Sequence, residues 1–141
     1  MFPHLYALPL ILSYANSSRE SKTTRAEIRL PNGSRAFLIH PQNKNPHHLP
    51  GIYLQHGMSV MGIDDPRILT LAENLSELGF SIMLPELTEV RSLNIQTNTI
   101  QNIQNLVQIL HAKSDWYNGK KLGFLSASFS GGMGLISISK P

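Results

Sequence analysis

The hydrophobic pattern along the chain changes between the two-residue period of a strand and the period of a helix. Residues 25–30 place apolar side chains at every second position, and residues 36–39 form a second apolar run after an Asn-Gly turn. The two runs together predict a β-hairpin. Residues 51–55, 80–84 and 122–125 are three further apolar runs of the length typical of buried strands.

Two amphipathic helices are expected between these later strands. The first has Asp65 as its cap residue and Pro66 as its first helical residue, and it ends at Gly79. Its apolar stripe consists of Ile68, Leu71, Ala72, Leu75 and Leu78. The second begins at Asn98, with Gln101 placed for a capping box. Its stripe consists of Ile100, Ile103, Val107 and Leu110, and its many Asn and Gln residues are most simply interpreted as a solvated face.

This order of elements predicts an α/β protein. After an N-terminal β-hairpin, strands that alternate with helices form an open, mostly parallel sheet with helices on both faces. The length of 141 residues is sufficient for one domain with a modest core. We expect that domain to span residues 26–141, after an apolar segment and a polar linker in residues 1–25. In such sheets the chemistry lies beyond the carboxyl ends of the strands.

A serine-containing turn follows the last predicted strand. Ser128 has small residues two positions before it, at Ser126, and two positions after it, at Ser130, which is the pattern of a nucleophile elbow. Small neighbours are needed because the chain folds back sharply, and the following helix start offers unpaired N–H groups to an oxyanion. Ser130 fits the pattern too, with Gly132 after it. Ser128 is preferred because it directly follows the strand and places Gly131 where the helix must approach closely.

Composition narrows the classes of function. The net charge of +3, without a run of basic residues, gives no support for nucleic-acid binding. The absence of cysteine excludes a disulfide framework, a thiolate zinc site and a cysteine nucleophile. Neither a metal nor a cofactor is expected, since the adjacent His47 and His48 lack the converging ligands of a zinc site. A nucleotide-binding loop at residues 131–134 is a weaker alternative, because no Gly-Lys-Ser/Thr sequence follows and Ser137 replaces a third glycine.

The first residues of the sequence do not decide in which cellular compartment the protein is located. Residues 5–15 are apolar, and Ser13 and Ala15 have the small-residue spacing of a signal-peptide cleavage site. Residues 1–4 carry no Lys or Arg, however, and the apolar run is shorter than the roughly 20 residues of a membrane span. The simplest interpretation is a helix that lies on the domain of a cytoplasmic protein. Export or membrane anchoring through residues 5–15 is the alternative.

From residue 27 onwards the chain resembles the first half of an α/β-hydrolase. The resemblance rests on the strand that ends in His56-Gly57, the helix start at residues 62–67, the segment 85–87 and the elbow. It implies that Ser128 is the nucleophile and that the backbone N–H groups of Met58 and Phe129 form the oxyanion hole. It also implies that His56, Gly57 and Gly131 order the surrounding loops, and that His56 is not the catalytic base.

The sequence departs from this family in its catalytic triad. In these enzymes the acid and then the histidine follow the serine, but residues 129–141 contain no Asp, Glu or His. The resemblance therefore implies the N-terminal portion of a serine hydrolase for esters, thioesters or related acyl bonds, inactive alone because its serine lacks a base. The expected partners are an ester or acyl substrate and a C-terminal half or a second copy. A non-catalytic interaction module, or pseudoenzyme fragment, is the alternative.

Overall fold

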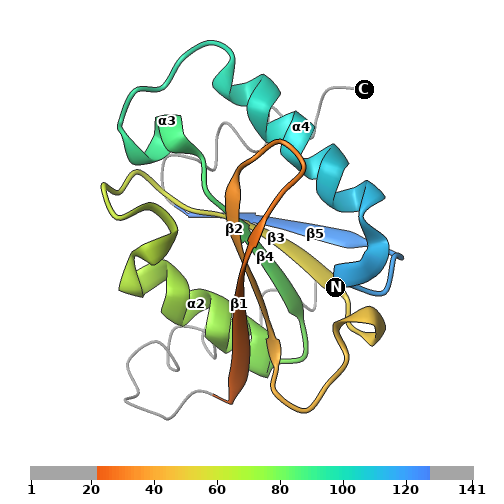
Figure 1. Cartoon of the computed structure of the whole chain (residues 1–141). Helices are drawn as coiled ribbons and strands as arrows, with labels where there is room; N and C mark the ends of the chain where they lie inside the picture. Colours follow the sequence, from red (N-terminus) through yellow and green to blue (C-terminus); the bar gives the residue numbers. More distant parts are fainter. Residues whose placement is uncertain (1–21, 128–141) are drawn as a thin grey trace, which may run out of the picture.

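The computed structural model describes residues 22–127, and Figure 1 shows how their strands and helices are arranged. All five expected strands are present: β1 (Thr23–Arg29), β2 (Arg35–Pro41), β3 (Gly51–Gln55), β4 (Ser81–Pro85) and β5 (Leu122–Ser126). The helices are α2 (Pro66–Glu77), the short α3 (Thr88–Arg91) and α4 (Thr99–Ala112). Three 3-10 turns connect them: η1 (Pro46–His48), η2 (Gly62–Asp64) and η3 (Ser114–Trp116).

The strands form one open, mixed sheet with the order β1-β2-β4-β3-β5. The hairpin strand β2 pairs antiparallel with both β1 and β4, whereas β3 pairs parallel with β4 on one side and β5 on the other. The carboxyl ends of β3, β4 and β5 therefore lie at the same edge of the sheet. The β1–β2 turn lies there too, because Ala36 at the start of β2 is opposite Pro85 at the end of β4. We call this edge the carboxyl edge.

The two longer helices cover opposite faces of the sheet, as expected (Figure 1). Alternate residues of β3 show the arrangement, because Tyr53 belongs to the core under α4 and the next residue, Leu54, belongs to the core under α2. The α4 core includes Ile103, Leu106 and Leu110, and the α2 core includes Ile68, Ala72 and Leu75. The helical stripes read from the sequence are therefore largely the buried faces. Leu78 is an exception, 43% exposed, because α2 ends one residue before it.

The two predicted helix starts have different outcomes. The Asp65 side chain accepts a hydrogen bond from the backbone N–H of Arg67 at 3.0 Å, with Pro66 as the first helical residue, as predicted. The capping box predicted for α4 is wrong, since Asn98 makes no side-chain cap bond. The Gln101 amide instead donates to Asn105 one turn later, at 3.0 Å. This i,i+4 pairing on the exposed face competes with the reach back to the cap.

Several predictions concern residues outside the described range. The apolar segment at residues 5–15, the domain boundary near residue 25 and the helix expected after the elbow stay predictions. No helix in residues 22–127 is long and apolar enough to cross a membrane. Strands β1 and β5 are the two outermost strands of the described sheet. Among the described strands, β5 pairs with β3 alone.

Candidate functional site

The carboxyl ends of β3 and β5 lie side by side at the carboxyl edge. In the parallel register, Gln55 at the end of β3 is opposite Ser126 at the end of β5, and the backbone N–H of Ala127 donates to the carbonyl of Gln55 at 3.0 Å. The segment that begins at His56 and the segment that begins at Ala127 thus start from adjacent strands. Ser128, Phe129, Ser130 and Gly131 lie outside the described residues, so their assigned roles stay predictions.

A cavity of about 310 Å³ lies beyond these two strand ends. His56, Gly57 and Met58 line it from the end of β3, Ala127 from the end of β5, and Ile68 and Leu71 from α2. Ser59, Gly62, Asp65 and Arg67 supply its remaining, more polar part. The volume is at the lower end of that of ligand pockets in proteins. The residue directly before Ser128 therefore lines the same cavity as Met58.

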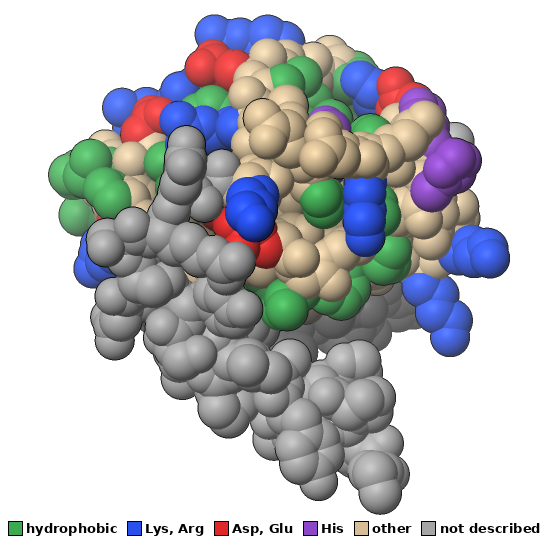
Figure 2. All heavy atoms as spheres, turned by 90° about the horizontal axis from the view of Figure 1, so that it is seen from below, with side chains coloured by type: hydrophobic (Ala, Val, Ile, Leu, Met, Phe, Trp, Pro, Cys, Tyr) green, Lys and Arg blue, Asp and Glu red, His purple; other side chains and the backbone are tan. Residues whose placement is uncertain are grey.

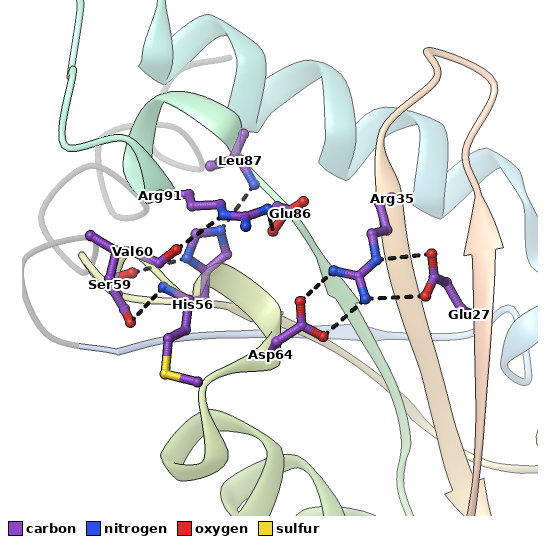
Figure 3. A network of polar contacts seen from close by, with 11 residues as sticks. Glu27, Arg35, His56, Ser59, Val60, Asp64, Glu86, Leu87 and Arg91 are labelled. Carbon is purple, nitrogen blue, oxygen red and sulfur yellow. Dashed lines mark hydrogen bonds and ion pairs between the residues drawn. The ribbon is translucent and has the colours of Figure 1, made fainter.

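Both ring nitrogens of His56 are used by the backbone. The imidazole is 1% exposed; its Nε2 accepts a hydrogen bond from the N–H of Leu87 at 3.0 Å, and its Nδ1–H donates to the carbonyl of Gly57 at 2.9 Å (Figure 3). This pair of bonds requires the neutral ring, and burial lowers the pKa of His56 accordingly. A histidine with both nitrogens engaged has no site left to take a proton from a neighbouring serine.

The other histidines in residues 22–127 lie at the opposite edge of the sheet. His40 is near the end of β2, which runs antiparallel to β4, and His47 and His48 lie in η1 just before β3 starts. His111 is in the last turn of α4, where its Nδ1 is 2.9 Å from the hydroxyl of Tyr117. Figure 2 shows histidine side chains gathered on one side of the molecule. Within the described residues, no histidine is thus placed to activate a nucleophile at position 128.

Polar contacts fix the segment from His56 to Asp64, which we call the His-Gly loop, to helix α2. The hydroxyl of Ser59 donates to the carboxylate of Asp65 at 2.8 Å. The same carboxylate caps α2 and accepts from the side chain of Arg67 at 2.7 and 3.0 Å. These bonds, with that from Arg67 as the largest cause, hold the pKa of Asp65 well below its usual range. Asp65 therefore stays ionised and keeps the loop attached to the helix.

Two arginines fix the same loop from the other side (Figure 3). Arg91 of α3 donates through Nε to the carbonyl of Val60 at 3.1 Å and pairs with Glu86 at 3.1 Å. Arg35 of β2 forms a two-pronged pair with Asp64, at 2.5 and 2.9 Å, and also bonds Glu27 of β1. Sequence reasoning missed both arginines, because their partners in the His-Gly loop, Val60 and Asp64, are about 30 residues away in the chain. Together they connect the His-Gly loop to the hairpin and to α3.

Within this loop, the backbone N–H of Met58 is a donor without an acceptor in the described part of the chain. Its side chain is 42% exposed and its φ angle is negative. A backbone N–H held in a fixed loop beside a cavity can stabilise a developing negative charge without having to reorganise.

Solved structures match the chain, although no family model and no curated protein does. Brefeldin A esterase, a bacterial homologue of human hormone-sensitive lipase, superposes with a TM-score of 0.66 at 13% identity over 95% of this chain. A dienelactone hydrolase-like promiscuous phosphotriesterase from metagenomic libraries gives 0.63 at 18% identity over 81%, and a dienelactone hydrolase from Anabaena variabilis gives 0.55 at 21% over 82%. The chain spans 41%, 53% and 57% of the lengths of these proteins.

These similarities define the fold. The neighbours are esterases, lipase homologues and dienelactone hydrolases of the α/β-hydrolase fold, and the described sheet has that fold over about half of their length. The resemblance read from the sequence is thus confirmed at the level of the fold. At identities of 13–21%, the comparison carries no information on the substrate.

The buried, neutral His56 predicts a pH dependence of stability. In the unfolded chain the imidazole binds its proton near the ordinary value of 6.5, whereas in the folded chain the pKa is lower. The stabilisation is therefore complete above pH 6.5 and decreases as the pH falls through the window between 6.5 and the lower folded value. Urea unfolding at pH 7.5 to 5 is expected to show a shallower loss of stability for His56→Gln than for the wild type. His47→Gln, in an exposed turn, is the control that keeps the wild-type slope; an unchanged slope for His56→Gln would contradict the assignment.

Proposed function

We propose that this chain provides the nucleophile and the oxyanion hole of a serine hydrolase that cleaves esters, thioesters or related acyl bonds. The observation that carries the proposal is that Ala127, directly before Ser128, lines the same cavity as Met58. A serine one residue further on starts from the carboxyl edge, where an open sheet of this kind places its chemistry. The esterases and hydrolases among the structural neighbours support the same class of reaction.

In the proposed reaction, Ser128 Oγ attacks the carbonyl carbon of the bound ester and loses its proton to a base. The carbonyl oxygen becomes an oxyanion that accepts hydrogen bonds from the N–H groups of Met58 and Phe129. Collapse of this intermediate expels the alcohol and leaves an acyl-enzyme on Ser128. A water molecule then cleaves the acyl-enzyme and restores the serine. Ile68 and Leu71 of the cavity would contact an apolar acyl chain.

The general base that would take the proton from Ser128 is not found among the described residues. His56 is engaged at both nitrogens, and the other described histidines lie at the opposite edge of the sheet. Residues 129–141 contain no histidine, aspartate or glutamate. We therefore propose that the acid and the base come from a segment outside residues 22–141, in the same polypeptide or in a partner. Without them the serine is a weak nucleophile.

Reaction with a fluorophosphonate, which modifies activated serines, tests the proposal on the chain itself. Added imidazole supplies the missing general base in solution. We expect the folded chain to gain one phosphonyl group, at least about ten times faster with imidazole than without, since general bases contribute larger factors when they are positioned. Equal reaction of the folded and the urea-unfolded chain would instead favour a non-catalytic interaction module.

A further inference from the structure

A second and larger cavity lies at the carboxyl edge on the α4 side of the sheet. Its volume is about 550 Å³. It is bounded by the β1–β2 turn at Asn32 and Ser34, by residues 86–89 after β4, and by one face of α4, elements that lie side by side in Figure 1. The proposed hydrolase site does not use this space, although the two cavities share a wall, since Leu87 lines this one and donates to His56 of the other.

The amide side chains of α4 give this cavity a polar, uncharged wall. Asn102, Asn105 and Gln108 face it, so part of the Asn- and Gln-rich side of the helix is the wall of a cavity. Helix α4 contains no Lys, Arg, Asp or Glu between Thr99 and Ala112. Solvated helix faces usually carry interspersed charges of both signs. An uncharged row of amides offers donors and acceptors together, as a neutral hydrogen-bonding ligand requires.

Neighbouring contacts fix the direction of these amides. Asn102 donates through its NH₂ group to the carboxylate of Glu89 at 2.5 Å, which leaves the Asn102 carbonyl oxygen as an acceptor. Asn105 accepts from the Gln101 amide at 3.0 Å, which leaves the Asn105 NH₂ group as a donor. A donor and an acceptor one turn apart match a pair of adjacent hydroxyl groups, each of which can donate and accept.

Charge and the apolar floor restrict the ligand further. Glu86 and Glu89 line the cavity, and none of its described lining residues is Lys or Arg, so an anion would be repelled. Glu86 is already paired with Arg91. Buried Leu87 and Leu106, with Ile109, give the cavity an apolar portion beside its polar wall. A ring with hydroxyl groups at its rim and C–H groups on its faces presents both kinds of surface.

From this arrangement we propose that the α4 cavity binds a neutral, polyhydroxylated ring, that is, a sugar. The volume is within the range of about 300–1,000 Å³ of small-molecule sites. The inference is independent of the proposed hydrolase activity, because it concerns a different cavity and needs no catalytic residue.

Nuclear magnetic resonance of the ¹⁵N-labelled chain tests this proposal. The probes are methyl glycosides of glucose, mannose, galactose and N-acetylglucosamine, each at up to about 50 mM, which detects complexes with millimolar Kd. We expect at least one of them to shift the side-chain NH₂ signals of Asn102, Asn105 and Gln108 in a saturable way. Glucuronate is expected to bind at least about tenfold more weakly than glucose, because a carboxylate would face Glu86 and Glu89.

A matched pair of variants locates the binding. Asn105→Leu removes the exposed donor and is expected to weaken the sugar complex at least about fivefold, the usual effect of one lost hydrogen bond. Asn43→Leu, at an exposed loop position remote from the cavity, is expected to keep the wild-type Kd. The proposal is overturned if no glycoside shifts these signals, if glucuronate or a blocked glycine peptide binds as well, or if Asn105→Leu binds like the wild type. The backbone spectrum of each variant verifies its fold.

Discussion

The Ser128→Ala variant is expected to lose imidazole-dependent reaction with the fluorophosphonate completely, a decrease of at least about 100-fold from the wild-type rate. The physical reason is that phosphonylation needs an oxygen nucleophile, which we propose is the Ser128 hydroxyl, and alanine has none. Because Ser128 immediately follows Ala127 at the end of β5, alanine there is not expected to disturb the sheet.

Ser130→Ala and Ser126→Ala are the matched controls for this experiment. Each removes a hydroxyl group two residues from Ser128 and leaves a small side chain, so each is expected to keep at least about a third of the wild-type rate. Mass spectrometry of the intact chain gives the rates, and tandem spectrometry locates the adduct. A dead Ser130→Ala variant beside a reactive Ser128→Ala variant would move the nucleophile by two residues.

Met58→Pro is the second change with a large expected effect. Proline removes the backbone N–H of residue 58 together with the methionine side chain, and the negative φ angle there is of the sign that proline requires. Loss of one oxyanion-hole donor lowers reaction rates by about 100- to 1,000-fold. We expect a decrease of that order in the rate of phosphonylation of Ser128. The measurement is the same labelling rate with imidazole.

The control for Met58→Pro is Met58→Ala, which shortens the half-exposed side chain and keeps the N–H. We expect its labelling rate to lie within about threefold of the wild type. Equal losses in both variants would mean that the side chain, and not the backbone donor, matters. Urea unfolding of both variants separates a damaged loop from a lost donor, because a loop that had detached from Asp65 and Arg35 would lower stability.

The elements of this fold could be predicted because their signals are local. Alternation in residues 25–30, the helical stripe after Pro66 and the apolar run at residues 122–125 each reflect burial along one short segment. The sheet order β1-β2-β4-β3-β5 is not encoded in any one segment, and only the structure shows it. The capping box predicted for the start of α4 is wrong because Gln101 has a competing partner, Asn105, one turn later.

The sequence likewise predicts some residues of the candidate site but not the contacts that hold them in place. His56, Gly57 and Met58 could be singled out because they directly follow a strand, and the structure places all three at one cavity with Ala127. The contacts that fix this loop could not be predicted, since Arg35 meets Asp64 from another part of the sheet and Arg91 meets Val60 from α3. The sequence alone indicates a solvated face for the amides of α4, because only the folded chain brings Glu89 and the β1–β2 turn opposite them.

The amide resonance of Met58 in the phosphonylated chain tests the central claim most directly. In the proposed mechanism, the phosphonyl oxygen of that adduct on Ser128 occupies the position of the oxyanion. The account predicts a downfield shift of the Met58 amide proton and slower exchange with solvent, because the N–H gains a charge-assisted hydrogen bond. The amide of Lys44, at the opposite edge of the sheet, serves as the reference and stays unchanged. An adduct on Ser128 that leaves the Met58 amide where it was would contradict the account.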